Sequence, residues 1–94
     1  MSEWKYVSED AAEGLCRIEQ FGIRKRQDDG DDVEFVITIR EFVHPPDKAM
    51  PFFAQSDKAV NQRTASYTPC GWGATSNEAL WECVKAIRKF PYEP

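Results

Sequence analysis

The sequence has a single histidine, too few cysteines for a disulfide scaffold and no long apolar run. Its three cysteines, Cys16, Cys70 and Cys83, are scattered, and their odd number leaves at least one thiol unpaired in any arrangement. No stretch approaches the roughly 18 consecutive apolar residues of a membrane-spanning helix. The first residues, MSEWKY, include an acid where a signal peptide has basic residues followed by an apolar run. We therefore expect a reduced, cytoplasmic protein with no disulfide scaffold and no contact with a membrane.

The sequence also lacks an excess of positive charge. Its 94 residues include 12 Lys and Arg against 16 Asp and Glu, for a net charge of −4. A general nucleic-acid-binding role is therefore not expected. Hydrophobic residues make up 41% of the chain and aromatic residues 13%, which is enough for one modest core. We predict a single domain over residues 1–94.

Groups of residues that could hold a metal or a cofactor are scarce. The cysteines and His44 could be pooled into a zinc site, but the closely spaced ligand pairs of structural zinc sites are missing. The aspartates of residues 28–32 lack the spacing of an EF-hand loop. Residues 71–73, Gly-Trp-Gly, could cradle a phosphate but contain no lysine. We predict no metal site and no cofactor.

The most clearly marked element is a helix in the last quarter of the chain. Thr75 and Glu78 have the spacing of a capping box, in which the Glu carboxylate reaches back to the Thr amide. Basic residues near its end suit the helix dipole, and Pro91 stops it. Residues 71–73 predict a glycine turn before the helix, with positive φ at the glycines. The apolar stripe is Ala79, Leu80, Cys83, Val84, Ala86, Ile87 and Phe90.

Two strands are predicted upstream, joined by an acidic turn. Residues 33–43 alternate regularly between apolar and polar side chains. In residues 15–26 the apolar face switches near Gln20, which predicts a one-residue bulge. A turn centred on Gly30 would place Phe21 opposite Ile39, a favourable apolar pair.

The rest of the chain is less strongly patterned. Three prolines predict a loop over residues 44–51, and residues 52–60 predict a third, weaker strand. Tyr67 is either an isolated anchor or part of a short fourth strand. The resulting order favours an α+β domain: a three- to four-stranded antiparallel sheet with the C-terminal amphipathic helix packed on one face.

The N-terminal residues leave alternatives open. Residues 4–7 predict a short strand. Residues 8–14 form either a single helical turn capped by Ser8 or a loose turn. A longer helix from Ser8 to about Phe21 would have to include Gly14, at a cost of about 1 kcal/mol.

The start of the C-terminal helix resembles that of HicB-like antitoxin domains. Those domains run from a sheet into a Gly-x-Thr-x-x-Glu-Ala-Leu segment, and residues 73–80 here read Gly-Ala-Thr-Ser-Asn-Glu-Ala-Leu, with Ala-Ile at 86–87. Residues 69–71, Pro-Cys-Gly, are similar to the proline–glycine turn of that family. The resemblance implies a non-catalytic protein-binding module of a bacterium or phage, antitoxin-like or accessory and often dimeric. Such antitoxins usually carry a DNA-binding segment after this helix, which residues 91–94 do not supply.

We predict protein partners and a homodimer formed through an exposed sheet edge. Trp81 points off the apolar stripe, so it is either covered by the N-terminal segment or an exposed anchor for a partner. Trp72 is expected to cap the end of the core. The acidic turn could imitate a phosphate track for a basic partner. The candidate partner-binding residues are Trp72, Trp81, Lys85, Arg88, Asp28, Asp29, Asp31 and Asp32.

Two other function classes compete with this prediction. An RNA-binding domain would use the basic triplet Arg24, Lys25 and Arg26, with Trp4 and Tyr6 for stacking. A thiol-dependent enzyme would use Cys70 as the nucleophile, activated at the helix N-terminus and by His44 as a base; this is the weaker of the two.

Overall fold

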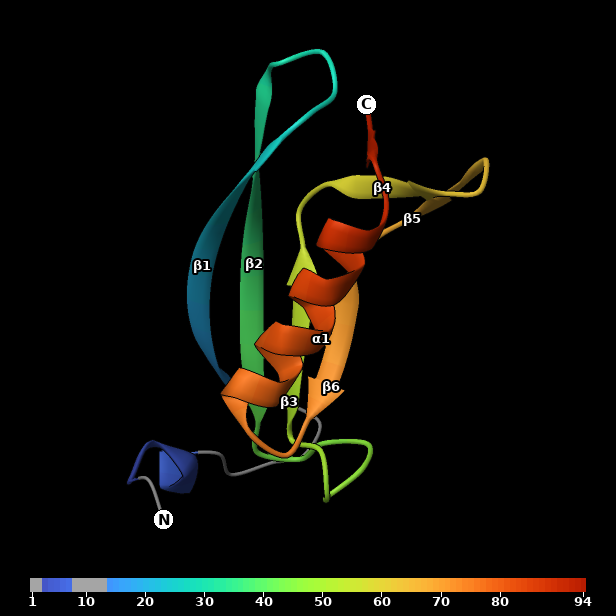
Figure 1. Cartoon of the computed structure of the whole chain (residues 1–94). Helices are drawn as coiled ribbons and strands as arrows, with labels where there is room; N and C mark the ends of the chain where they lie inside the picture. Colours follow the sequence, from blue (N-terminus) through green and yellow to red (C-terminus); the bar gives the residue numbers. More distant parts are fainter. Residues whose placement is uncertain (1–2, 8–13) are drawn as a thin grey trace.

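An antiparallel four-stranded sheet with one helix across it forms the body of this α+β protein (Figure 1). The computed structural model describes residues 3–7 and 14–94. The main sheet has the order β1-β2-β3-β6, and a small three-stranded sheet has the order β5-β4-β7. Within residues 3–7 and 14–94, no helix has both the length and the apolar character needed to cross a membrane. The elements are η1 (Glu3–Val7), β1 (Cys16–Arg26), β2 (Asp32–Phe42), β3 (Phe52–Ser56), β4 (Ala59–Gln62), β5 (Ala65–Tyr67), β6 (Cys70–Gly73), α1 (Ser76–Lys89) and β7 (Tyr92–Glu93).

The helix α1 begins and ends where the sequence predicts. The Thr75 hydroxyl accepts a hydrogen bond from the Glu78 amide at 3.1 Å. The Glu78 carboxylate accepts from the amide of Ala74 at 2.9 Å, one residue before the predicted Thr75 amide. The helix ends at Lys89, two residues before Pro91. Local capping chemistry and the proline therefore set both ends.

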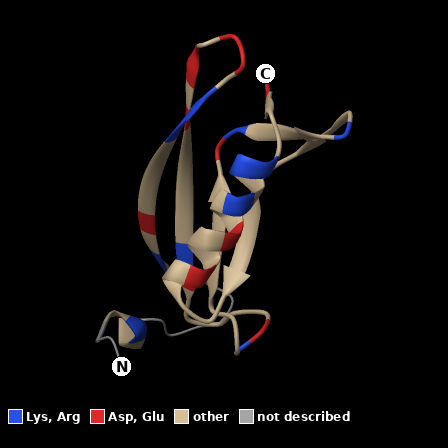
Figure 2. Ribbon diagram, in the orientation of Figure 1, with Lys and Arg blue, Asp and Glu red and all other residues tan. Residues whose placement is uncertain are grey.

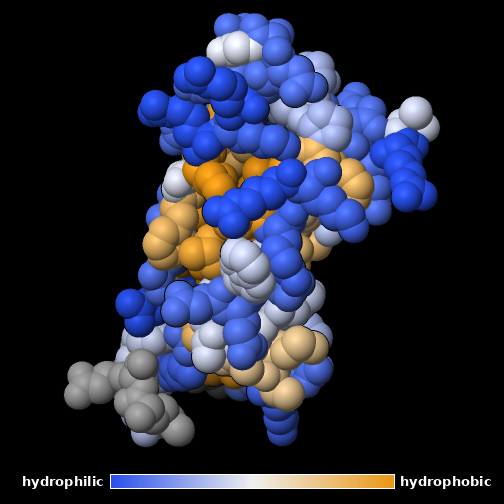
Figure 3. Space-filling view, in the orientation of Figure 1, coloured by the Kyte–Doolittle hydropathy of each residue, from blue (hydrophilic) through white to orange (hydrophobic). Residues whose placement is uncertain are grey.

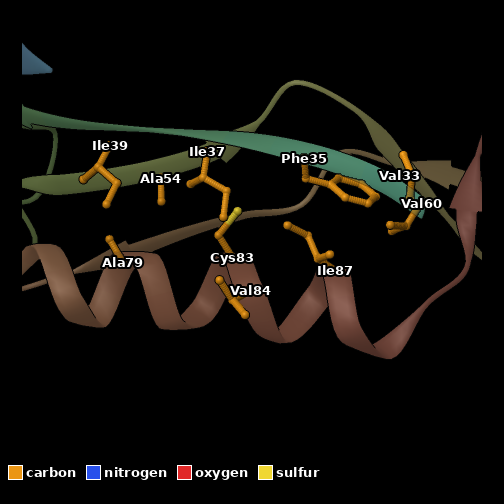
Figure 4. Close-up of a cluster of buried hydrophobic side chains, with 10 residues drawn as sticks. All are labelled: Val33, Phe35, Ile37, Ile39, Ala54, Val60, Ala79, Cys83, Val84 and Ile87. Carbon is orange, nitrogen blue, oxygen red and sulfur yellow. The ribbon is translucent and has the colours of Figure 1, made fainter. Parts of the chain in front are cut away.

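The core lies between α1 and the row of β2 side chains that faces it (Figure 4). Phe35, Ile37 and Ile87 are fully buried there. Phe35 also meets the ring of Tyr92 edge-on, with the ring centroids 5.9 Å apart. The helix stripe and the β2 strand predicted from periodicity are thus confirmed. The buried hydrophobic residues are Val33, Phe35, Ile37, Ile39, Ala54, Val60, Ala79, Cys83, Val84 and Ile87.

The predicted glycine turn at residues 71–73 is wrong, because these residues form the strand β6. Gly71 pairs with Ala54 and Gly73 with Phe52 on β3, and neither glycine has a positive φ. A Cβ on Gly71 would overlap the Cβ of Glu82 on the helix, and a Cβ on Gly73 would lie 2.6 Å from the Ala79 nitrogen. The glycines are there because α1 packs directly on the backbone of β6.

The predicted bulge and register of the first hairpin are also wrong. β1 pairs with β2 without interruption, and Phe21 lies opposite Ile37. The Gln27 amide donates to the Asp31 carbonyl at 2.8 Å, and Gly30 closes the loop of residues 28–30 with a φ of 90°. Gly30 is thus the last loop residue and not its centre, which moves the pairing along by one step on each strand. The apolar pattern switches because Ile18 is 51% exposed on the face away from the helix.

Smaller differences concern the third strand and the N-terminus. Predicted strand 52–60 breaks at Asp57, whose carboxylate accepts from the Val36 amide at 2.9 Å, and the chain continues as β4 in the small sheet. Tyr67 lies in β5, a short strand of that small sheet. Residues 4–7 belong to the 3-10 helix η1 and not to a strand. A helix from Ser8 to Phe21 is wrong because residues 16–21 lie in β1, whereas residues 8–13 fall outside the described part of the chain.

Candidate functional site

The outer edge of β1 is the longest free strand edge of the main sheet. The strand has 11 residues, and within the described ranges no other strand pairs with its outer side. The helix α1 packs on β6, β3 and β2, which leaves β1 beyond its cover (Figure 1). Unpaired strand edges present rows of N–H and C=O groups that readily accept another strand.

Hydrogen bonds just beyond both ends of the β1–β2 ladder show which β1 residues point outward. The Gln27 amide donates to the Asp31 carbonyl, and the Val43 amide donates to the Leu15 carbonyl at 3.2 Å. Backbone groups alternate in direction along an antiparallel strand, so odd-numbered β1 residues bond to β2. The even-numbered ones direct their N–H and C=O groups away from the sheet. They are Cys16, Ile18, Gln20, Gly22, Arg24 and Arg26.

A groove of about 360 Å³ lies beside this edge, between β1 and α1. Figure 3 shows its apolar atoms gathered between the strand and the helix. The Phe21 side chain is 42% exposed on the β1 side, and Trp81 is 53% exposed on the helix side. We call this feature the β1–α1 groove. It is lined by Phe21, Gly22, Ile23, Ile37, Asn77, Leu80, Trp81, Val84 and Arg88.

Lys25 fixes the end of the helix against β1. Its ammonium group donates to the carbonyl of Ile87 at 2.7 Å and also to the carbonyl of Phe90. These carbonyls lack partners within the helix, and a cation there favours the helix dipole. Burial lowers the pKa of Lys25, although the nearby Asp28 carboxylate acts in the opposite direction. The Lys25 side chain therefore ties the C-terminal end of α1, the helix that forms one wall of the groove, to β1.

Replacing Lys25 with methionine is expected to lower the free energy of unfolding by about 1.5 kcal/mol, since two charge-assisted bonds to the helix end are lost. Urea denaturation monitored by circular dichroism measures the change. The control is Lys48→Met, because Lys48 lies exposed in the loop after β2. Equal stability of the two variants would contradict the capping role.

The structure brings two of the predicted partner-binding residues together in the β1–α1 groove. Trp81 lines its helix side, and the guanidinium of Arg88 lies over the Trp81 ring, 5.8 Å from its centroid. Trp81 is thus exposed and not covered by the described part of the N-terminus. Lys85 forms an ion pair with Glu82 at 2.9 Å and lines a different cleft. Of the three predicted partner-binding residues on the helix, only Trp81 and Arg88 therefore belong to this surface.

Trp72 lies on the opposite face of the sheet. Its ring packs against Phe53 with the centroids 4.6 Å apart, and Phe42 lies 6.1 Å away. Its side chain remains 38% exposed. The prediction that Trp72 caps the end of the core is therefore wrong, because alternation along β6 turns it away from the helix.

The acidic turn forms an exposed tip at the end of the β1–β2 hairpin (Figure 2). Asp28 and Asp29 line a second cleft, of about 510 Å³, which shares Arg88 with the β1–α1 groove. Asp32 forms an ion pair with Arg26 at 3.3 Å, and the Asp31 amide is bound by the Asp29 carboxylate. The aspartates at 28 and 29 are thus the members of the turn that lie next to the groove.

Sequence reasoning missed the apolar residues of the groove that come from β1. Phe21 and Ile23 look like ordinary core residues in a strand pattern, and Leu80 like part of the buried stripe. Their partial exposure follows from the place of β1 at the sheet margin, which the pattern does not encode. The only signal was Ile18, an apolar residue out of phase with the buried face.

The structure does not assemble the predicted thiol site. Cys70 begins β6 and is not at the start of α1, and its sulfur lies 3.8 Å from the Tyr67 hydroxyl. His44 lines another cleft, next to Phe42 and Lys5. Cys83 is buried, and its thiol donates to the carbonyl of Pro69. The thiol chemistry expected of Cys70 thus lacks the geometry of a nucleophile beside its base.

Cys83 is expected to resist alkylation until the protein unfolds. Burial raises the pKa of its thiol from about 9 to about 12, so the reactive thiolate is scarce at neutral pH. Iodoacetamide labelling followed by peptide mass spectrometry at pH 8 should modify Cys16 and Cys70 well before Cys83. Because the folded state favours the neutral thiol, its contribution to stability should be lost as the pH rises from 9 toward 12. Early labelling of Cys83 in folded protein would contradict the packing of α1.

The basic triplet does not form a common cationic surface. Lys25 is bound to the helix carbonyls, Arg26 is paired with Asp32, and Arg24 lies opposite Glu34 in the ladder. Trp4 and Tyr6 belong to η1, whose Lys5 contacts Glu41 at the far end of β2. The cations and the aromatic residues of the RNA-binding hypothesis are therefore at opposite ends of the hairpin.

Comparisons of the chain with family models, with curated proteins and with solved structures find no match. The HicB-like resemblance of the helix start thus stays a prediction. The free edge of β1 and the adjoining groove are the features from which a function can be argued.

Proposed function

We propose that this protein is a small, non-catalytic protein-binding module that takes up an extended segment along the outer edge of β1. The observation that carries the proposal is an uninterrupted strand of 11 residues with outward backbone groups beside an apolar groove. Strand addition of this kind gains affinity from main-chain hydrogen bonds and specificity from neighbouring side-chain pockets. An antitoxin-like or accessory role in a bacterium or phage fits the resemblance of the helix start.

The edge supplies the bonding groups that strand addition needs. The even-numbered residues of β1 offer donors and acceptors at regular spacing, and no proline or bulge interrupts the strand. Sheets normally protect long edges by such interruptions, by a cover or by charged side chains, and of these three β1 has only the charged side chains. An edge left this long and regular is suited to pairing.

The groove supplies the apolar contact. Phe21 and Trp81 face it from opposite sides, and both retain large exposed areas. Aromatic residues of this kind contribute strongly when a partner removes them from water. Asp28 and Asp29 line the neighbouring cleft together with Lys25, Arg26, Arg88 and Lys89, so charged groups of both signs lie next to the groove.

Affinity capture from a native extract with matched tryptophan variants tests the proposal. Trp81→Ser changes the groove, whereas Trp72→Ser changes the opposite face of the sheet. We expect Trp81→Ser to lose the captured partner and Trp72→Ser to keep it. If Trp72→Ser loses the captured partner and Trp81→Ser keeps it, the binding surface lies on the other face of the sheet and the proposal is overturned.

A further inference from the structure

We infer that the β1 edge pairs with the β1 edge of a second copy of this chain, antiparallel and with a two-fold axis at Gly22. This inference rests on the proposed function and names its partner. The geometry that supports it is the self-complementarity of β1 in one register, together with the outward direction of the Gly22 backbone.

A two-fold axis at Gly22 pairs apolar with apolar side chains and opposite charges with each other on the groove face. On the groove face, Phe21 lies opposite Ile23 of the second copy, and Glu19 lies opposite Lys25 of the second copy. On the other face, Gln20 lies opposite Arg24, and Ile18 lies opposite Arg26. Apolar pairs and opposite charges directly across an antiparallel ladder are stabilising.

The neighbouring registers lack this match. An axis at Phe21 places the apolar Ile23 opposite the charged Glu19. It also places two like charges, Lys25 and Arg17, opposite each other. An axis at Ile23 places Phe21 opposite Lys25, and an axis at Gln20 places Phe21 opposite Glu19. Of these four axes, only the one at Gly22 places Phe21 opposite an apolar residue and Glu19 opposite a cation, so the Gly22 register is preferred.

The backbone also suits an axis at this residue. Gly22 is even-numbered, so its N–H and C=O groups point outward and can bond reciprocally to Gly22 of the second copy. Gln20 and Arg24 then exchange both of their backbone bonds across the axis, and so do Ile18 and Arg26. The pairing therefore satisfies outward groups along most of the strand.

Two of the four cations of β1, Lys25 and Arg26, have partners within their own chain, which reduces the repulsion between two approaching β1 strands. Arg26 is paired with Asp32 at 3.3 Å, and Lys25 is bound to the helix carbonyls. Arg24 lies opposite Glu34 on β2. In the Gly22 register, no cation of one β1 strand lies directly opposite a cation of the other.

Dimerisation would join the two β1–α1 grooves. A two-fold axis perpendicular to the sheet keeps both helices on the same face, so Phe21 and Ile23 of the two copies form one apolar strip between them. This removes from water part of the Phe21 side chain, which is 42% exposed in the single chain. The apolar side chains of Phe21 and Ile23 on β1 then become part of an interface.

A proline at Gln20 tests the pairing without breaking the β1–β2 ladder, since the Gln20 amide points outward. Sedimentation equilibrium should show a dimer for the wild type, and Gln20→Pro should weaken it by roughly 100-fold. Gln20→Thr keeps the amide and is expected to dimerise like the wild type. Circular dichroism checks that Gln20→Pro is folded. Should it unfold, Glu19→Arg leaves the backbone intact and should weaken the dimer roughly 10-fold by repulsion from Lys25.

Disulfide trapping tests the register. In a Cys16→Ser, Cys70→Ser background, Gly22→Cys should cross-link two chains faster than Phe21→Cys or Ile23→Cys, because only Gly22 meets itself at the axis. A monomeric wild type, or fastest cross-linking at another position, would overturn the inference.

If the wild type is monomeric but Gln20→Pro and Trp81→Ser abolish capture of another protein, the proposed function stands and the second-copy partner alone is wrong. If the wild type is monomeric and these two variants capture that protein normally, the proposed function and the second-copy partner are both wrong.

Discussion

Phe35→Ala is expected to lower the free energy of unfolding by about 4 kcal/mol. Phe35 is 0% exposed, and its ring meets Tyr92 edge-on at the end of the core. Removing it leaves a cavity between β2 and the last turn of α1, where the backbone of both elements is fixed by its own hydrogen bonds. Urea denaturation measures the loss.

Phe53→Ala is the matched control for this prediction. Phe53 lies on the face of the sheet away from the helix and is partly exposed beside Trp72. Its removal creates no closed cavity, so the expected loss is about half that of Phe35→Ala. Equal losses would show that both faces of the sheet are covered, contrary to the architecture described.

Gly71→Ala is expected to destabilise the protein by about 3 kcal/mol. The new methyl group would overlap the Cβ of Glu82 and would lie 2.9 Å from the carbonyl oxygen of Ala79. Because these are atoms near the helix backbone, α1 would have to move away from β6 to make room. Thermal and urea denaturation should both report the loss.

Gly22→Ala is the matched control, since Gly22 is also a strand glycine of the main sheet. A Cβ there would meet the Glu34 carboxylate at 2.9 Å, which is the free end of a flexible side chain and can turn away. We expect a change of less than about 1 kcal/mol. A Gly71→Ala variant as stable as Gly22→Ala would mean that α1 does not lie directly on β6.

The elements that sequence reasoning predicted well are those determined by nearby residues. The helix follows from the Thr75 cap, the apolar stripe and Pro91, all within one segment. The strand β2 follows from its own alternation. Local signals of this kind do not depend on which other parts of the chain come to lie beside them.

The features that sequence reasoning missed depend on contacts between distant segments. Gly71 and Gly73 form a strand because β3 pairs with them and α1 packs on them, which no local pattern reveals. The register of the β1–β2 hairpin depends on whether Gly30 is the centre of the loop or its last residue. A difference of one position there shifts every residue pair between the two strands.

The candidate site was predictable only in part, for the same reason. Trp81 and Arg88 could be identified from the helix alone, because they fall outside its apolar stripe. Phe21 became a site residue because β6 joins the sheet next to β3 and draws the helix away from β1. Strand order is a property of the whole chain, so the exposed edge could be expected but not assigned to β1.

Amide hydrogen exchange of β1, followed by NMR, tests most directly whether the outer edge of this strand is a binding surface. The amides of Phe21 and Ile23 bond to β2 and should be protected in the wild type and in Gln20→Pro alike. The account predicts that the amides of Gly22 and Arg24 are protected in the wild type at concentrations where it associates and exchange freely in Gln20→Pro. Free exchange at Gly22 and Arg24 in the associated wild type would contradict it.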